Sequence, residues 1–133
     1  MAPELSFHPV TRADYSLLRG WFARDHVRAF WGPPAHELAL IEADLDGGDT
    51  AMFIVRLAGR PIGFIQDRCP HSDGERHFAH MPPGTRAVDC FLGAADLLGQ
   101  GIARRFVRDR AEALHAAGAP AIVTDPRTDN PRA

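Results

Sequence analysis

The fold is decided by the stretch 87–110, which reads AVDCFLGAADLLGQGIARRFVRDR. Its first six residues are mainly apolar and predict a buried strand. Glycines at positions 93, 99 and 101 predict a turn, and a helix is expected to begin near Ile102. Backbone N–H groups at such a turn, together with the positive end of the helix, form a site for a phosphate or pyrophosphate. An ordinary glycine turn without a ligand is the alternative.

Two well-known phosphate loops do not match this turn. A P-loop requires a lysine, and the chain contains none. The dinucleotide pattern G-x-G-x-x-G is also incomplete, because Gly99 and Gly101 are followed by Ile-Ala-Arg. The motif that remains is LGQGIA at 98–103.

The composition favours one soluble domain spanning residues 1–133. A chain of 133 residues with 45% hydrophobic and 24% charged residues is ordinary for a globular protein. A net charge of −2 argues against a nucleic acid or an anionic membrane as partner. Neither a membrane-length apolar run nor a signal peptide is recognisable, and two cysteines suggest no disulfide framework. A cytoplasmic location is therefore expected.

Outside the central stretch, the sequence pattern predicts alternating strands and helices. Thr11 is expected to cap a helix, with Asp14 as its capping-box partner. Helical pattern continues to Gly32. The other expected elements are a helix over about 36–45, strands over 50–57 and 61–68 joined by a hairpin at 58–60, and strands over 5–10 and 121–124.

Three polar or aromatic side chains are candidates for a site. Asp89 interrupts an apolar strand, so it lies either on a solvated face or in a site. Trp31 is either a core aromatic or a wall beside a substrate. Gln66, near the end of an apolar strand, is either a surface residue or a hydrogen-bonding partner of the substrate.

Other polar residues are expected to have no metal or core role. Cys69 and the histidines at 71, 77 and 80 match no zinc spacing, so no metal site is expected. Arg104, Arg105, Arg108 and Arg110 are expected to form a mostly solvated helix face, with Arg104 close enough to the turn to help hold a phosphate.

The chain resembles the GCN5-related N-acetyltransferases. The element order matches, and Leu98 to Ala103 resembles the family's pyrophosphate loop, with Leu98 where the family often has Arg or Gln. Within the family, it looks most like the aminoglycoside 6'-N-acetyltransferases and siderophore-type acyltransferases. The segments that carry this are HVRAFWG at 26–32, GRPIGFIQ at 59–66, PGTRAVD at 83–89 and TDPRTDNPRA at 124–133.

The resemblance implies an α/β fold with a mixed sheet, acetyl-CoA as cofactor and transfer of an acetyl group to a primary amine or hydroxylamine of a small molecule. It also implies roles for individual residues. Asp89 would be catalytic and, with Asp125, would bind the acceptor, while Trp31 and Gln66 remain acceptor-binding candidates from the residue pattern. The cofactor would be bound by Phe91, Leu92 and Gly93, by Leu98, Gly99, Gln100, Gly101, Ile102, Ala103 and Arg104, and by Asn130.

Two departures from the family qualify these expectations. The segment 71–82 is less acidic than a site for a polycationic drug requires. The chain ends at Ala133, where the family continues through a helix and two strands, so a fold without these elements is expected. An open sheet edge would then favour a homodimer. The alternative function is a coenzyme A-binding module, or an inactive truncated acetyltransferase.

Overall fold

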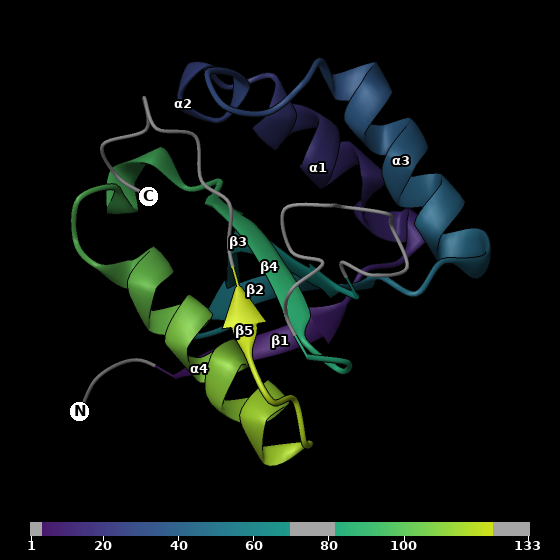
Figure 1. The fold of residues 1–133 in the computed structure, drawn as a ribbon. Coiled ribbons are helices and arrows are strands. Elements are labelled where there is room, and N and C mark those ends of the chain that lie inside the picture. The colour runs from purple at the N-terminus through teal and green to yellow at the C-terminus, as the bar shows by residue number, and fades with distance from the viewer. Residues whose placement is uncertain (1–3, 70–81, 124–133) are drawn as a thin grey trace.

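The computed structural model describes residues 4–69 and 82–123, which form a five-stranded sheet flanked by helices (Figure 1). The strand order is β1-β2-β3-β4-β5, antiparallel except for the parallel pair β4–β5. The expected mixed sheet is confirmed. Its elements are β1 (Leu5–Pro9), η1 (Arg12–Asp14), α1 (Tyr15–Phe22), α2 (Asp25–Arg28), α3 (Pro34–Gly47), β2 (Ala51–Leu57), β3 (Arg60–Arg68), β4 (Arg86–Leu92), η3 (Ala95–Leu97), α4 (Ile102–Ala116) and β5 (Ile122–Val123).

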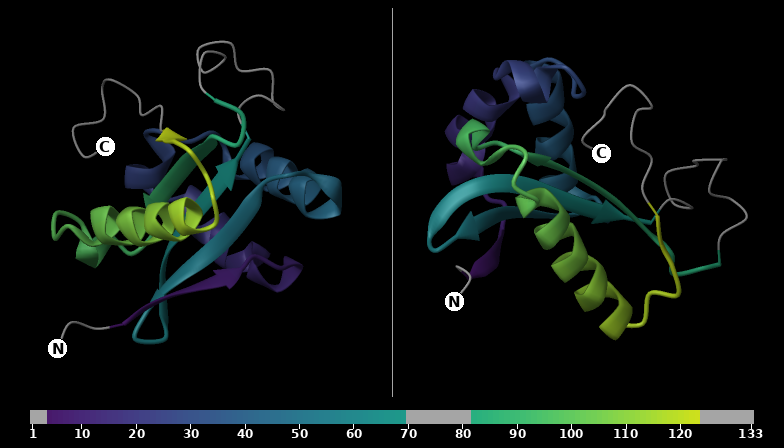
Figure 2. Two further views of the ribbon diagram at one scale, coloured as in Figure 1. Left: turned by 60° about the horizontal axis from the view of Figure 1, so that its bottom comes forward. Right: turned by 90° about the vertical axis from the view of Figure 1, so that its left-hand side faces the viewer.

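The sheet has a separate hydrophobic core on each face. Helices α1 to α3 cover one face and α4 covers the other (Figure 2). Because side chains alternate along a strand, Phe64 and Phe91 pack under α1–α3, whereas Ile65 and Leu92 pack under α4. Among the described residues, no helix has the length and apolar composition that crossing a bilayer requires.

The N-terminal helical region is divided rather than continuous. The backbone N–H of Thr11 donates to Asp14 at 2.9 Å, as expected of a capping box. Helix α1 ends at Phe22, and Arg24 is extended before the short α2, so the expected uninterrupted region is wrong. Helix α3 begins at Pro34, earlier than predicted, because proline fits the first turn of a helix.

The two central strands meet in the expected hairpin. Strands β2 and β3 pair antiparallel from Ala51–Asp67 to Leu57–Arg60. Ala58 and Gly59 form the turn with φ angles of 50° and 85°. Two consecutive positive φ angles match the twist of the flanking strands.

A buried carboxylate ties α4 to the sheet. The side chain of Asp67 on β3 is 1% exposed and accepts hydrogen bonds from Arg86 Nε at 3.0 Å and Nη2 at 2.7 Å. It also accepts one from Arg110 Nε on α4 at 2.7 Å. The Arg110 guanidinium lies 4.6 Å from the centre of the Phe53 ring. The prediction of a solvated Arg110 is therefore wrong, because the buried charge of Asp67 requires a partner.

Candidate functional site

The loop before α4 has the geometry of an anion site. Gly99 and Gly101 have φ angles of 79° and 76°, which disfavour any residue with a Cβ. A Cβ placed on either glycine would have no atom within 4 Å, so the backbone of this loop borders open space. The glycines are needed here for backbone conformation and leave room for a ligand.

The N terminus of α4 supplies donors to the same place. Its N-cap is Gly101, and no side chain caps the helix. The first bond of the helix runs from Arg105 N to Gly101 O at 3.1 Å, so the N–H groups of the preceding residues have no partner within the helix. These N–H groups belong to Ile102, Ala103 and Arg104, which were predicted to bind the cofactor. Three donors and the helix dipole suit a phosphate or pyrophosphate.

Contacts on its N-terminal side hold this loop in place. Arg60 donates to both carboxylate oxygens of Asp96 on η3, at 3.0 and 2.7 Å. This bonding lowers the pKa of Asp96. The Gln100 side chain donates to the Asp96 carbonyl at 3.1 Å, and Leu98 packs against the core under α4. Both side chains are therefore engaged within the protein, and the backbone N–H of Leu98 donates to Ala95 O at 3.2 Å.

Strand β4 presents a backbone edge beside this loop. Gly93 N donates to Ile62 O at 2.8 Å, and hydrogen-bonded pairs alternate along an antiparallel ladder, so the N–H groups of Cys90 and Leu92 point away from β3. Strand β5 pairs with β4 only at Arg86 and Ala87. From Val88 to Leu92 this edge has no strand partner within the described ranges 4–69 and 82–123. An extended chain of amides, such as pantetheine, can pair with such an edge.

The end of β4 is bonded by Arg24, which precedes α2, and by His26 on α2. Arg24 donates to Gly93 O at 2.6 Å, and His26 donates to Leu92 O through Nε2 at 2.7 Å. A Cβ on Gly93 would lie 2.3 Å from the Trp21 ring, so only glycine fits there. The sequence analysis did not identify Arg24 and His26, because local sequence pattern does not predict contacts between residues 66 to 69 positions apart. Of the predicted pantetheine contacts, Gly93 N–H is thus used internally and Leu92 N–H faces outward; their roles stay predictions.

Two of the predicted acceptor residues, Gln66 and Asp89, lie on the face of the sheet under α1–α3. Gln66 on β3 lies directly opposite Asp89 on β4. Asp89 also bonds Arg68, with Nη1 2.5 Å from Oδ2. The side chains of Arg68 and Asp89 are 21% and 32% exposed, so the pair is reachable from solvent. Asp89 therefore lies on a partly solvated face, which was one of its two alternatives. The sequence did not indicate its charged partner, Arg68.

Trp31 belongs to an aromatic cluster on that same face. Its ring centre lies 5.3 Å from Phe91, 6.1 Å from Phe64 and 5.9 Å from Phe22. The core interpretation of Trp31 is confirmed by these contacts. A further contact with substrate stays a prediction, since the side chain is only partly buried.

The remaining predicted residues fall partly outside the structure. Asp125, Asn130 and the histidines at 71, 77 and 80 lie outside the described residues. Within the described ranges, no group of three His, Cys, Asp or Glu side chains is placed to hold a metal ion.

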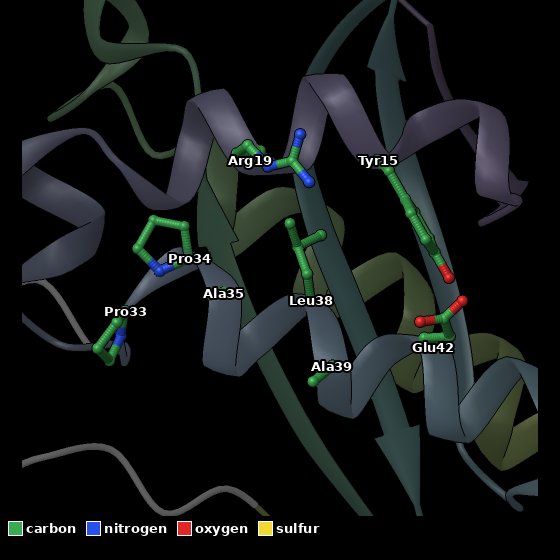
Figure 3. A pocket seen from close by; sticks show the side chains of 8 residues that line it. All are labelled: Tyr15, Arg19, Pro33, Pro34, Ala35, Leu38, Ala39 and Glu42. Atoms are coloured by element: carbon green, nitrogen blue, oxygen red, sulfur yellow. The ribbon is translucent and has the colours of Figure 1, made fainter.

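A surface groove between α1 and α3 is lined by Tyr15, Leu38 and Glu42 (Figure 3). It contains neither Asp89 nor the 98–104 loop, so the site is assigned by its chemistry and not by this groove.

Cys90 is expected to be an inert thiol. Burial, with a smaller contribution from the Asp89 charge, raises its pKa to about 12. Only about one molecule in ten thousand then carries the thiolate at pH 8. Iodoacetamide at pH 8 should label Cys90 far more slowly in the folded chain than in urea, as read by peptide mass spectrometry. Equal rates in the two conditions would contradict the inert thiol and leave Cys90 open as a covalent acetyl carrier.

The chain is similar in sequence to known acetyltransferases. The family model described as "Acetyltransferase (GNAT) domain" matches residues 10–133. A curated relative from Klebsiella pneumoniae, named aminoglycoside N(6')-acetyltransferase type 1, is 29% identical over 133 residues. The match covers 93% of this chain and 66% of the relative, so the chain spans just under two thirds of that relative's length.

Solved structures share the fold. Aminoglycoside acetyltransferase AAC(6')-Ib in complex with coenzyme A superposes with a TM-score of 0.84 at 28% identity, covering 97% of this chain and 78% of that one. The same enzyme with coenzyme A and kanamycin gives 0.82 at 27% identity, over 96% and 77% of the two chains. An uncharacterised Bacillus halodurans protein gives 0.85 at 19% identity, over 96% and 68%, a likeness of fold alone.

Proposed function

The chain belongs to the GNAT acetyltransferase family, and on this premise we propose that it transfers the acetyl group of acetyl-CoA to a primary amine or hydroxylamine of a small molecule. The observation that carries the proposal is the open turn at Gly99–Arg104, next to the edge of β4 that has no strand partner among the residues the structure describes. Two structures of a relative hold coenzyme A, which supports the choice of cofactor.

The residues present fit acetyl-CoA. The N–H groups of Ile102, Ala103 and Arg104 would bind its pyrophosphate, and the outward N–H groups of β4 would bind its pantetheine amides. When bound, acetyl-CoA supplies an acetyl group activated as a thioester. Asn130 is proposed as a further contact, from the resemblance in sequence alone.

For this reaction the chain has to position the acceptor amine and remove a proton from it. The carboxylate of Asp89 would bind the ammonium form of the acceptor and accept its proton, directly or through water. The outward N–H of Leu92 would donate to the oxyanion that develops during attack. Gln66, opposite Asp89, would orient the acceptor, with Trp31 and Asp125 as further walls of the site.

The proposal is tested by thiol release from acetyl-CoA with a panel of amines. Aminoglycosides come first in the panel, because the curated relative is named an aminoglycoside acetyltransferase and a structure of AAC(6')-Ib contains kanamycin. Acetyl-CoA should bind the chain, and NAD and ATP should not, since the loop matches neither nucleotide pattern. Binding without thiol release for any amine would instead favour a coenzyme A-binding module.

Asp89→Asn should separate catalysis from cofactor binding. The amide keeps the shape of the side chain but cannot accept the acceptor's proton, so turnover should fall roughly 100-fold. The affinity for acetyl-CoA, measured by calorimetry, should stay within a few-fold. Equal turnover of the variant and the parent chain from pH 6 to 9 would remove Asp89 from the catalytic role.

We also propose a homodimer and a cytoplasmic location. Strands β1 and β5 are the outer strands of the sheet, and within the described residues each is paired on one side only. Unpaired edges favour association between chains. Light scattering at tens of micromolar should give twice the 14.6 kDa mass of the chain. A monodisperse monomer would contradict the dimer. The cytoplasmic location is tested separately, by cell fractionation.

A further inference from the structure

Two side chains from the segment around α2 bond the carbonyls at the end of β4. His26 Nε2 lies 2.7 Å from Leu92 O, and Arg24 Nη1 lies 2.6 Å from Gly93 O. These contacts join residues 66 and 69 positions apart, so they are features of the fold and not of local turn chemistry. They lie at the end of the edge on which the cofactor is proposed to bind.

The backbone that carries these two side chains is held by hydrogen bonds and by burial. Arg24 N donates to Trp21 O at 3.0 Å, and Arg24 O accepts from Val27 N at 3.1 Å. The Val27 side chain is 1% exposed and belongs to the core under α1–α3. His26, which directly precedes this buried anchor, therefore approaches β4 from a fixed position.

The bond from His26 changes which hydrogen-bonding groups the edge of β4 offers. In an antiparallel ladder the N–H and C=O of one residue point to the same side, so Leu92 O points away from β3, as its N–H does. A strand edge presents both donors and acceptors, and an incoming strand pairs with both. Because His26 bonds Leu92 O, the group that this residue offers to a ligand is its N–H donor. The end of the edge is thus suited to a ligand that brings a hydrogen-bond acceptor.

We propose that His26 is a positioning residue, which holds the Leu92 peptide group so that its N–H meets the thioester carbonyl of acetyl-CoA. The inference rests on the proposed function, in which this N–H donates to the developing oxyanion, and deepens it by naming the side chain that holds the donor. His26 itself is given no contact with the reacting atoms. Its effect on the reaction is through geometry, since a misplacement of about 1 Å can cost on the order of 100-fold in rate.

The test compares two ligands that differ at one carbonyl. Acetyl-CoA carries the thioester oxygen, whereas the thioether S-ethyl-CoA has a methylene group in its place. Binding of each to the full chain is measured by calorimetry without an acceptor amine, so the result does not depend on turnover. The parent chain should bind acetyl-CoA about five- to tenfold more tightly than S-ethyl-CoA, the scale of one net hydrogen bond.

His26→Leu should remove this preference. Its affinity for acetyl-CoA should fall to that for S-ethyl-CoA, and the latter should change by less than about twofold, because S-ethyl-CoA has no oxygen for the Leu92 donor. His26→Gln offers an N–H at a matching distance along the side chain and should restore the preference, which a side chain that only fills space would not do. His36→Leu, an exposed histidine on α3, is the matched control and should leave both affinities unchanged.

The outcomes separate this inference from the proposed function. An unchanged preference in His26→Leu, or equal losses of affinity for both ligands, would overturn the positioning role and leave the acetyltransferase proposal standing. Loss of the preference in a chain that releases no thiol with any amine would do the reverse. A parent chain that binds both ligands equally would overturn the inference as well. If circular dichroism shows that His26→Leu does not fold, His26→Asn, whose shorter side chain withdraws the donor, carries the same expectation.

Discussion

Asp67→Asn should lower the free energy of unfolding by about 3 kcal/mol. The substitution keeps the shape of the side chain but removes the negative charge that two arginines share. Because the Asp67 side chain is 1% exposed, the loss is close to that for breaking a buried pair. Arg86 and Arg110 are 21% and 19% exposed, and the water that reaches them keeps the cost at the low end of the range of about 3–5 kcal/mol.

Urea unfolding followed by the fluorescence of Trp21 and Trp31 measures this effect. Asp96→Asn is the matched control, because Asp96 also bonds an arginine through both oxygens but its side chain is 61% exposed. The midpoint of that variant should hardly move, as is usual for a solvent-exposed pair. Equal midpoints for Asp67→Asn and the parent chain would show that α4 is held to the sheet by its apolar contacts alone.

Local pattern was sufficient for the order of the elements and for the glycine turn before α4. Alternation of apolar residues located β2 and β3, and Ala58-Gly59 located their hairpin. The loop at Gly99 and Gly101 was predictable because it depends on two adjacent facts: glycine at positive φ, and a helix that begins directly after it. Both depend on residues that lie close together in the sequence.

The contacts that the sequence did not indicate join distant parts of the chain. Arg68 reaches Asp89 across 21 positions, Arg110 reaches Asp67 across 43, and Arg24 reaches Gly93 across 69. Alternation can assign a residue to a face, but the partner opposite it depends on strand register, which the hairpin fixes for β2–β3 only. The break after Phe22 was missed for the same reason, since it serves contacts made by Arg24 and His26 to the end of β4.

Gly101→Glu should weaken acetyl-CoA binding at least 100-fold, as measured by calorimetry. The backbone at this N-cap has φ of 76°, so any Cβ strains the turn by about 1–2 kcal/mol. The new side chain would also enter the open space that the N–H groups of Ile102 and Ala103 face. Its carboxylate would compete for these donors and repel the phosphates of the cofactor. A 100-fold loss corresponds to about 2.7 kcal/mol, which the combined steric and electrostatic effects can supply.

Gly118→Glu is the control that separates this local effect from general strain. Gly118 also has positive φ, 105°, and open space around its Cβ, but it lies at the opposite end of α4. The control therefore carries the same charge and a similar backbone strain while leaving the donors of the loop untouched, so its affinity for acetyl-CoA should equal that of the parent chain. If both variants bound acetyl-CoA equally well, the cofactor would not lie on the N terminus of α4, and the assignment of the 98–104 loop would have to be abandoned.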